Sequence, residues 1–382
     1  MIHDVVLLAL LTGSACGCLF MLLAAGVVPS FVPRKKPVLG TFPGVTILKP
    51  LHGDEPGLFE NLATFFRQDY TGAVQIVFGV ARADDPAIST VERLRATFPD
   101  AVIELVVDGR VAGSNPKVAN LINMSPRIAN DIVVLADSDI RVRSDYLSRI
   151  VSALETSSSA ATVPYYGIPM GGVWSQLGQM MIDSHFLPGV LVGARLKLSK
   201  PCLGSTIAFR RDALVAIGGF EAVADTLADD YEIGALLARN GYPVTVLPFT
   251  VGHACNETSF GELWRHELRW ALTIRTIDPL GYAGWAVTHA LPLALIALAL
   301  GGGWGAGFLA FAALCCRGVL IFAIERGYGL PRHPYWLIPT RDLLSFAVFL
   351  AGFVARGVSW RGHRYKLQPE GTLISDRRPP PP

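Results

Sequence analysis

The chain has 382 residues, a length that suits one folded domain with membrane segments better than two soluble domains. Hydrophobic residues make up 51% and charged residues 17%, and with a mean hydropathy of +0.41 this composition is too apolar for an ordinary soluble protein. The 33 basic and 31 acidic residues leave a net charge of +2, so the charge implies no nucleic acid or other polyanion as a partner. The six cysteines form no CxxC pair, and we expect neither a disulfide framework nor a zinc site.

Residues 5–28 carry no charged side chain and are long enough to cross a bilayer as a helix, which needs about 20 residues. We therefore predict a transmembrane helix within residues 1–33. A signal peptide is the weaker interpretation. Its apolar region has ~7–15 residues, fewer than this run, and it usually begins with basic residues, where this chain has Asp4. Arg34, Lys35 and Lys36 follow directly, and this positive charge places the next domain in the cytoplasm.

Short β-branched runs alternate with helix-like stretches from residue 45 to residue 251. We predict strands at 45–48, 74–80, 102–107 and 132–136, and helices at 56–67 and 88–98. This alternation predicts an α/β domain over residues 40–258, with a mostly parallel sheet. In such domains ligands bind beyond the carboxyl ends of the strands, where acidic motifs of this chain lie.

Asp137, Ser138 and Asp139 follow the predicted strand 132–136. Alternate residues of an extended segment point the same way, so the two carboxylates can converge. Together with diphosphate oxygens they suit Mg²⁺ or Mn²⁺, and such a cation would neutralise charge on a departing nucleoside diphosphate. A solvated turn at the strand end explains the same residues equally well.

Two other motifs in this region have both a functional and a structural interpretation. Asp85 can accept hydrogen bonds from a base or a ribose, although an Asp before Pro86 is more often the N-cap of a helix. Lys117, in the motif Asn115-Pro116-Lys117, is either a contact to a nucleotide phosphate or part of a plain loop.

Asp229 and Asp230 begin a predicted helix that runs to about Asn240. Acids at a helix start usually stabilise the helix end. If Asp230 points into a cleft, it can instead take a proton from an attacking hydroxyl. His253 is a possible metal ligand, although a buried, hydrogen-bonded histidine is the commoner case.

Residues 259–280 form a predicted interfacial helix directly before the apolar third of the chain. Tryptophan and arginine side chains anchor such a helix at a membrane surface. Arg269 and Trp270 can line a cleft from another face of the same helix.

The C-terminal part, residues 285–355, offers three apolar segments: 285–300, 304–324 and 337–355. Three full crossings would put residues 356–382 outside, yet this Pro-rich tail is basic and is expected in the cytoplasm. The third segment carries Arg341 and Asp342, which cost several kcal/mol within a bilayer unless paired. We therefore expect 337–355 to be re-entrant or interfacial, and the last Pro-rich residues to be disordered.

The acids and the Arg-Trp pair, taken in chain order, resemble the D, D, D, (Q/R)xxRW pattern of the membrane-bound family 2/21 glycosyltransferases. Asp85, Asp137 and Asp230 match the three acids, and Arg269-Trp270 matches the pair. The resemblance covers roughly residues 46–275 and implies a GT-A fold and an inverting transfer of a sugar from a UDP-sugar.

The resemblance also implies a role for each site residue, with Asp230 as catalytic base and Asp137 and Asp139 as ligands of Mg²⁺ or Mn²⁺. It places Asp85, Lys117 and Asp137 at the nucleotide-sugar. It places His266, Arg269 and Trp270 at the acceptor or the diphosphate. His266 stands where the family has Gln or Arg, and its charge would depend on pH.

The segments around these motifs narrow the resemblance further. Residues 49–51, 84–87, 115–117 and 138–142 are similar to ceramide glucosyltransferases. Residues 183–188 and 203–206 are most similar to the related bacterial hopanoid-biosynthesis enzymes. That similarity implies N-acetylglucosamine transfer to the membrane lipid bacteriohopanetetrol, by a multi-pass protein of the inner membrane with a cytoplasmic catalytic domain.

Three alternatives stay open. The nearest is glucose transfer from UDP-glucose to ceramide or another sphingoid lipid. A processive polysaccharide synthase shares the pattern, but three C-terminal segments are few for a polymer channel. A transporter or membrane scaffold with an inactive nucleotide-binding domain is opposed by the presence of all three acids.

Overall fold

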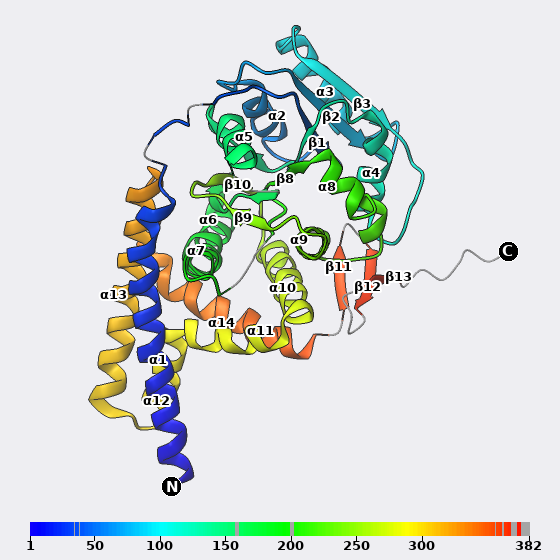
Figure 1. Ribbon diagram of the computed structural model, residues 1–382. Coiled ribbons are helices and arrows are strands. Elements are labelled where there is room, and N and C mark those ends of the chain that lie inside the picture. Colours follow the sequence, from blue (N-terminus) through cyan, green and yellow to red (C-terminus); the bar gives the residue numbers. More distant parts are fainter. Residues whose placement is uncertain are drawn as a thin grey trace, which may run out of the picture. The chain divides into compact units, whose positions relative to one another are not determined.

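The computed structural model describes residues 1–33, 35–37, 39–156, 160–198, 202–355, 357–360, 363–367 and 373–375 (Figure 1). The chain divides into two compact units. Residues Pro33–Met170 and Lys197–Asn256 form what we call the α/β unit. Met1–Val32, Gly171–Leu196 and Glu257–Pro382 form the helical unit.

The α/β unit contains a seven-stranded sheet of order β3-β2-β1-β4-β8-β6-β9. Strands β1 to β4 are parallel, β8 is antiparallel to β4 and β6, and β9 is parallel to β6. The four strands predicted from the sequence are all present. The bounds are β1 (Val45–Pro50), β2 (Val74–Val80), β3 (Val102–Val107), β4 (Ile132–Leu135), β6 (Ala160–Thr162), β8 (Ile207–Arg210) and β9 (Val244–Val246).

Burial on both faces explains the composition of the central strands. Every residue of β1 and β4 is buried, as in parallel sheets whose two faces are covered by helices. The covering side chains include Val118, Leu121 and Met124 of α4, which are fully buried in the same core as Leu48 of β1. The helices of the unit are α2 (Leu58–Ala63), α3 (Ala87–Thr97), α4 (Pro116–Met124), α5 (Tyr146–Thr156), α8 (Arg211–Ala216) and α9 (Asp229–Arg239).

A second, three-stranded sheet of order β5-β10-β7 completes the α/β unit. It consists of β5 (Ile140–Arg141), β7 (Tyr165–Pro169) and β10 (Val251–Cys255). Strand β5 follows β4 after only four residues, 136–139, so the Asp137-Ser138-Asp139 motif is the turn that joins the two sheets.

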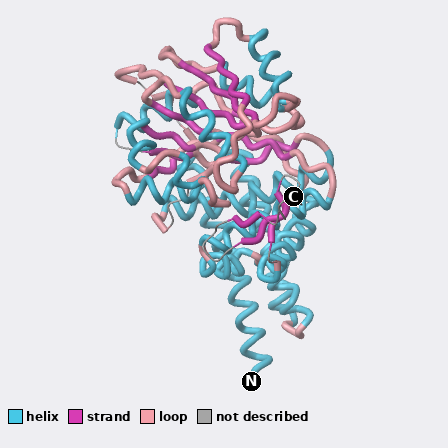
Figure 2. The backbone as a smooth tube through the Cα atoms, turned by 90° about the vertical axis from the view of Figure 1, so that its right-hand side faces the viewer, coloured by secondary structure: helices cyan, strands magenta, loops and turns pink. Residues whose placement is uncertain are grey.

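The helical unit is built mostly from long helices, including the one that begins at the N-terminus (Figure 2). A π-helical turn, η4 (Ile182–Phe186), lies between α6 and α7. The other elements are α1 (Ile2–Val27), α6 (Gly172–Met181), α7 (Leu187–Arg195), α10 (Phe260–Ile277), α11 (Pro279–Gly284), η6 (Trp285–Thr288), α12 (Ala290–Ala299), α13 (Gly303–Tyr328), η7 (Tyr335–Leu337) and α14 (Ile338–Val354).

Three stretches within the described residues are long and apolar enough to cross a membrane: Ile2–Phe31, Gly303–Tyr328 and Tyr335–Val354. Pro279–Thr288 and Ala290–Ala299 make a fourth if the pair, bent by 67°, is one broken span. Helix α14 is continuous, so the irregular backbone lies in 279–299 rather than in the segment 337–355.

Arg317, Arg341 and Asp342, three charged residues of these segments, are buried and lie close to a group of opposite charge. Arg317 Nε lies 3.0 Å from Asp342 Oδ1. The Arg341 guanidinium contacts both carboxylate oxygens of Glu267 at 2.6 Å. A charged side chain within a bilayer is costly in free energy unless it is paired, and these residues are paired. The reason for expecting α14 not to cross is thereby weakened, and its course through a membrane stays a prediction.

The predicted tail contains regular structure that its composition did not indicate. Strands β11 (Gly357–Trp360), β12 (His363–Leu367) and β13 (Leu373–Ser375) pair antiparallel in a small sheet. The last Pro-rich residues, 376–382, and Arg34 of the basic run lie outside the described residues.

Candidate active site

Lys117 joins acids that come from two different elements. Its Nζ lies 2.8 Å from Asp137 Oδ1, after β4, and 3.1 Å from Asp229 Oδ2, at the start of α9. Lys117 lies in the first turn of α4, and the Asn115 side chain caps this helix. The interpretation of the motif as a plain loop is therefore wrong. Burial lowers the pKa of Lys117, but the surrounding carboxylates raise it by more than burial lowers it. The ammonium group therefore stays charged.

Gly204 brings Asp137 and Asp230 to one point. Its backbone N–H donates to Asp230 Oδ2 at 2.9 Å. A Cβ atom on Gly204 would lie 2.9 Å from Asp137 Oδ2 and 3.4 Å from Asp230 Oδ2. Two of the three predicted acids therefore flank a small space that only glycine leaves open.

Asp230 has a pKa above that of an ordinary aspartate. Burial raises its pKa to about 6, the neighbouring Asp229 adds to this effect, and Lys117 opposes it. At neutral pH the carboxylate is mostly ionised, yet it binds a proton more readily than an ordinary aspartate. A catalytic base works best when its pKa lies near the working pH.

Asp139 faces the second sheet and pairs with a histidine. Its Oδ2 lies 3.2 Å from His253 Nε2, and its backbone carbonyl accepts the Ala254 N–H at 2.8 Å. Burial lowers the pKa of His253, but Asp139 outweighs this and holds it well above its usual value. The interpretation of His253 as a buried, hydrogen-bonded residue therefore agrees with its position.

Tyr165 lies beside the same group of acids. Its ring stacks on His253, with 5.3 Å between centroids. Burial raises the pKa of the Tyr165 phenol, and Asp230, Asp139 and Asp137 each raise it further. The three carboxylates are therefore close enough to one buried phenol for their charge to act on it.

The donor set at this centre fits a divalent cation that arrives with a diphosphate. Among the described residues, no three His, Cys, Asp or Glu side chains form a complete cation cluster. Mg²⁺ typically uses one or two carboxylates and takes its other ligands from phosphates and water. Asp137 and Asp139, whose side chains are 34% and 28% exposed, supply such a pair, with the clearance at Gly204 in front of Asp137.

Asp85 belongs to a separate set of contacts at the carboxyl end of the parallel strands. Its Oδ1 accepts the N–H of Gly53, after β1, and the N–H of Ala87, the first residue of α3, both at 2.9 Å. Pro86 is the N-cap residue of α3, and Asp85, one residue earlier, accepts from the first N–H of the helix instead of being its N-cap residue. The carboxylate also joins the loops that follow β1 and β2.

Lys49 is a site neighbour that sequence reasoning did not single out. It is fully buried in β1, and its Nζ donates to the Asp137 carbonyl at 2.8 Å while lying over the Phe65 ring. Burial holds its pKa well below the usual value. A lysine inside an otherwise apolar strand was the available signal, because lysine is almost never fully buried without a partner.

His266, Arg269 and Trp270 belong to the helical unit, on α10. His266 Nδ1 lies 2.6 Å from Glu257 Oε1, and its ring meets Trp270 edge-on with 4.8 Å between centroids. Trp270 also contacts Phe186 at 5.7 Å. The predicted helix is present, and it brings His266 and Trp270 into direct contact.

A family model described as "Glycosyl transferase family 21" matches residues 7–373 of the chain. Ceramide glucosyltransferase 3 of Caenorhabditis elegans is 27% identical over 210 residues, which cover 53% of this chain and 44% of that protein. Ceramide glucosyltransferase of Pyricularia oryzae is 21% identical over 432 residues, covering 87% and 86%. The chain spans less than half the length of the first curated relatives that it matches.

Among solved structures, the mannosyltransferase PcManGT from Pyrobaculum calidifontis, in complex with GDP-Man and Mn²⁺, is similar with a TM-score of 0.53. It is 19% identical, and the match covers 92% of this chain and 99% of that chain. At this identity the similarity concerns the fold. The predicted GT-A-like class, with apolar helices at the N-terminus and in the C-terminal region, is confirmed.

Proposed function

We propose, since the chain belongs to glycosyl transferase family 21, that it transfers one hexose from a UDP-sugar to a hydroxyl group of a membrane lipid. The observation that carries the proposal is the convergence at Gly204. There an acid at the end of β4 and an acid at the start of α9 flank one small space beside the Lys117 ammonium. The space offers a cationic group for a diphosphate and a basic carboxylate for a hydroxyl.

In this mechanism Asp230 takes the proton of the acceptor hydroxyl. The acceptor oxygen forms a bond to the anomeric carbon while the bond from that carbon to the phosphate oxygen breaks, and UDP leaves with the electron pair. Attack from the face opposite to UDP inverts the anomeric centre. The raised pKa of Asp230 supports this role, because the carboxylate must be ionised before attack and protonated after it.

The donor side would use the other acids and Lys117. Asp137 and Asp139 would hold a divalent cation, Mg²⁺ or Mn²⁺, which neutralises charge on the leaving diphosphate. Lys117 would add positive charge at the same place, and Asp85 would contact the base or ribose. His266, Arg269 and Trp270 of the helical unit are proposed to contact the acceptor or the diphosphate.

The ceramide glucosyltransferase relatives favour glucose transfer from UDP-glucose to ceramide or another sphingoid lipid. They support this alternative better than N-acetylglucosamine transfer to bacteriohopanetetrol in hopanoid biosynthesis. Both acceptors consist of an apolar body with hydroxyl groups, and both would reach the enzyme from a bilayer. The apolar helices and the basic residues after α1 support a multi-pass membrane protein, with the α/β unit in the cytoplasm and, in a bacterial cell, at the inner membrane.

The decisive experiment offers the purified enzyme UDP-glucose and UDP-N-acetylglucosamine, each with ceramide and with bacteriohopanetetrol. Mass spectrometry of the lipids should show one added glucose or N-acetylglucosamine for one UDP released, with the preferred pair identifying donor and acceptor. Products with several added sugars would instead support a polysaccharide synthase. The absence of both glycolipid and released UDP in all four mixtures would overturn the proposal.

A further inference from the structure

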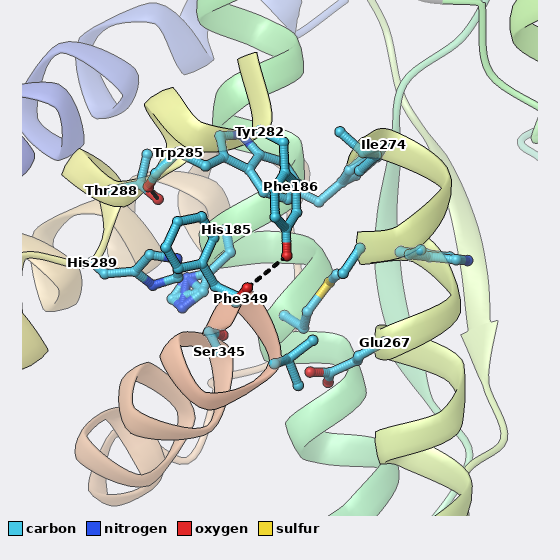
Figure 3. A pocket seen from close by; sticks show the side chains of 14 residues that line it. His185, Phe186, Glu267, Ile274, Tyr282, Trp285, Thr288, His289, Ser345 and Phe349 are labelled. Carbon is cyan, nitrogen blue, oxygen red and sulfur yellow. Dashed lines mark hydrogen bonds between the residues drawn. The ribbon is translucent and has the colours of Figure 1, made fainter. Parts of the chain in front are cut away.

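A pocket lies within the helical unit, between α10, the α11–η6 segment and α14 (Figure 3). The space between these elements that no atoms fill, part of it open to solvent, amounts to about 490 Å³. Aromatic and aliphatic side chains make most of its wall, among them Phe186, Trp270, Ile274, Tyr282 and Phe349. This composition favours an apolar ligand.

His289 is a polar residue of this wall with no hydrogen-bond partner for either ring nitrogen among the described residues. Its exposed fraction is only 5%, and its ring packs against both Phe346 and Phe349, with centroids at 5.5 and 4.9 Å. A buried polar group is nearly always hydrogen-bonded, because burial removes the water that would otherwise bind it. The two nitrogens therefore indicate a partner that comes from outside the chain.

Most other polar side chains of the wall have hydrogen-bond partners within the protein. The Tyr282 hydroxyl donates to the Phe349 carbonyl at 2.8 Å, as drawn in Figure 3, whereas His185 Nε2 lies 3.4 Å from Asp342 Oδ1 without a hydrogen bond. Thr288 donates to the Trp285 carbonyl, and Arg341 binds both Glu267 and Ser345. Among the described residues of the wall, His185 also leaves one ring nitrogen, Nε2, without a hydrogen bond, but only His289 leaves both ring nitrogens without one.

The backbone is irregular on both sides of the pocket. His289 lies at the 67° bend between η6 and α12, and Met181, His185 and Phe186 come from the π-helical turn and the residue before it. π-helical turns inside α-helices occur frequently at functional sites. Helix α14 belongs to a candidate membrane span, so a ligand dissolved in the bilayer is the natural occupant.

We propose that this pocket binds the lipid acceptor, with the aromatic wall around its apolar body and His289 hydrogen-bonded to its polar end. A neutral imidazole offers one donor and one acceptor, so it suits a lipid with neighbouring hydroxyl or amide groups. Ceramide and bacteriohopanetetrol both have such groups. The assignment rests on the proposed function, because it makes the bound lipid the acceptor of the sugar.

Lipid binding can be measured without catalysis, because Trp270 and Trp285 lie in the wall. The full chain in detergent is titrated with ceramide that carries a dibrominated acyl chain, which quenches nearby tryptophans, and in a second arm with brominated bacteriohopanetetrol. We expect saturable quenching for the wild type and about tenfold weaker binding for His289→Phe, as for the loss of one hydrogen bond. His289→Gln keeps a donor and an acceptor and should restore much of the affinity. The arm with the tighter binding identifies the source of the lipid.

Two further variants test the pocket itself. Ile274→Trp places a large ring in the wall and should weaken the binding of both lipids. Leu295 of α12 is 37% exposed and is not among the residues that line the pocket. The control variant Leu295→Phe should therefore bind both lipids as the wild type does. Unchanged binding of UDP in every variant shows that the chain has folded.

Kinetics separate this inference from the proposed function. In His289→Phe the KM for the lipid should rise about tenfold while the KM for the UDP-sugar stays the same. Transfer with an unchanged lipid KM in both His289→Phe and Ile274→Trp would overturn the pocket assignment and leave the proposed function intact. Lipid binding that depends on His289, without sugar transfer to any lipid, would overturn the assignment of the ligand as an acceptor together with the proposed function.

Discussion

Asp230 combines partial burial, a neighbouring carboxylate and two hydrogen bonds in one residue. Its Oδ2 accepts the Gly204 N–H at 2.9 Å and its Oδ1 accepts the Tyr231 N–H at 2.8 Å. These contacts fix the direction of the side chain, while burial and Asp229 raise its pKa to about 6. The residue is therefore held in place and also adjusted to accept a proton near neutral pH.

Replacement of this carboxylate should remove the chemical step while preserving donor binding. We expect Asp230→Asn to lower kcat by about 10²–10⁴-fold, the usual contribution of a general base, with little change in UDP-sugar affinity. Single-turnover transfer and equilibrium binding of the UDP-sugar measure the two effects. Asp212→Asn, an exposed acid at the start of α8, is the matched control. A turnover close to wild type in Asp230→Asn would show that another group is the base.

The pH dependence of transfer should report the same group. The base acts only when ionised, so kcat/KM should fall about tenfold per pH unit below a pKa of about 6 and be level above it. A profile measured from pH 4.5 to 8 with saturating cation tests this expectation. The residual rate of Asp230→Asn should lack the inflection. A flat wild-type profile across this range would contradict the role of Asp230.

Removal of divalent cations provides a third test at the residue scale. We expect a chelator to abolish transfer and Mg²⁺ or Mn²⁺ to restore it. Without the cation that Asp137 and Asp139 would hold, the negative charge of the leaving diphosphate is not neutralised. Asp139→Asn should need a higher cation concentration for half-maximal rate. Full activity in the presence of excess chelator would exclude the cation and assign its role to Lys117.

At the scale of elements, the candidate site depends on where segments end. The turn between β4 and β5 supplies Asp137 and Asp139, the first turn of α4 supplies Lys117, and the first turn of α9 supplies Asp230. The turn before β8 supplies Gly204, whose missing side chain lets these ends approach one another. The charged groups of the site are thus attached to the ends of separate helices and strands.

A methyl group at Gly204 should therefore damage the site without unfolding the protein. Its Cβ would lie 2.9 Å from Asp137 Oδ2, a distance at which the carboxylate must shift. We expect Gly204→Ala to lower kcat/KM at least tenfold while the melting temperature changes by only a few degrees. Gly40→Ala, where a Cβ would meet nothing within 4 Å, is the control. Wild-type kinetics in Gly204→Ala would show that the clearance has no catalytic role.

At the scale of the whole molecule, the two units use charge in opposite ways. In the α/β unit, acids crowd around few cations, and this imbalance suits a charged ligand. In the helical unit, Arg341 is matched by Glu267 on α10, so the charge ties α14 to α10. Such a pair adds little net stability, but loss of one partner leaves a buried charge alone.

The Arg341–Glu267 pair leads to a prediction for the stability of the helical unit. Arg341→Met alone should destabilise the chain by about 3–5 kcal/mol, because Glu267 is left buried and unpaired. The double variant Arg341→Met/Glu267→Leu should recover most of this loss, since two apolar side chains replace the pair. Thermal unfolding in detergent micelles measures both. A double variant no more stable than the single one would show that the pair has a role beyond mutual neutralisation.

Local pattern was sufficient for strands β1 to β4 and for the helix 260–277, because alternation and helical periodicity are properties of a few neighbouring residues. It also placed acids after β2 and β4, since a strand ends where its apolar run ends. It could not show that the Asp85 carboxylate accepts the N–H groups of Gly53 and Ala87, because Gly53 is far from Asp85 in the chain. The small sheet formed by residues 357–375 was not foreseen either, because its strands are too short and polar to show alternation.

The sequence by itself determined the α/β class, the apolar segments and the order of the acids, all of which follow from the chemistry of adjacent residues. Only the tertiary structure decided that Lys117 pairs with two acids, that Gly204 keeps a space open between Asp137 and Asp230, and that the nitrogens of His289 have no partner among the described residues. The reason is physical. Burial and electrostatic contact arise between residues far apart in the chain, and they exist only once packing has brought those residues together.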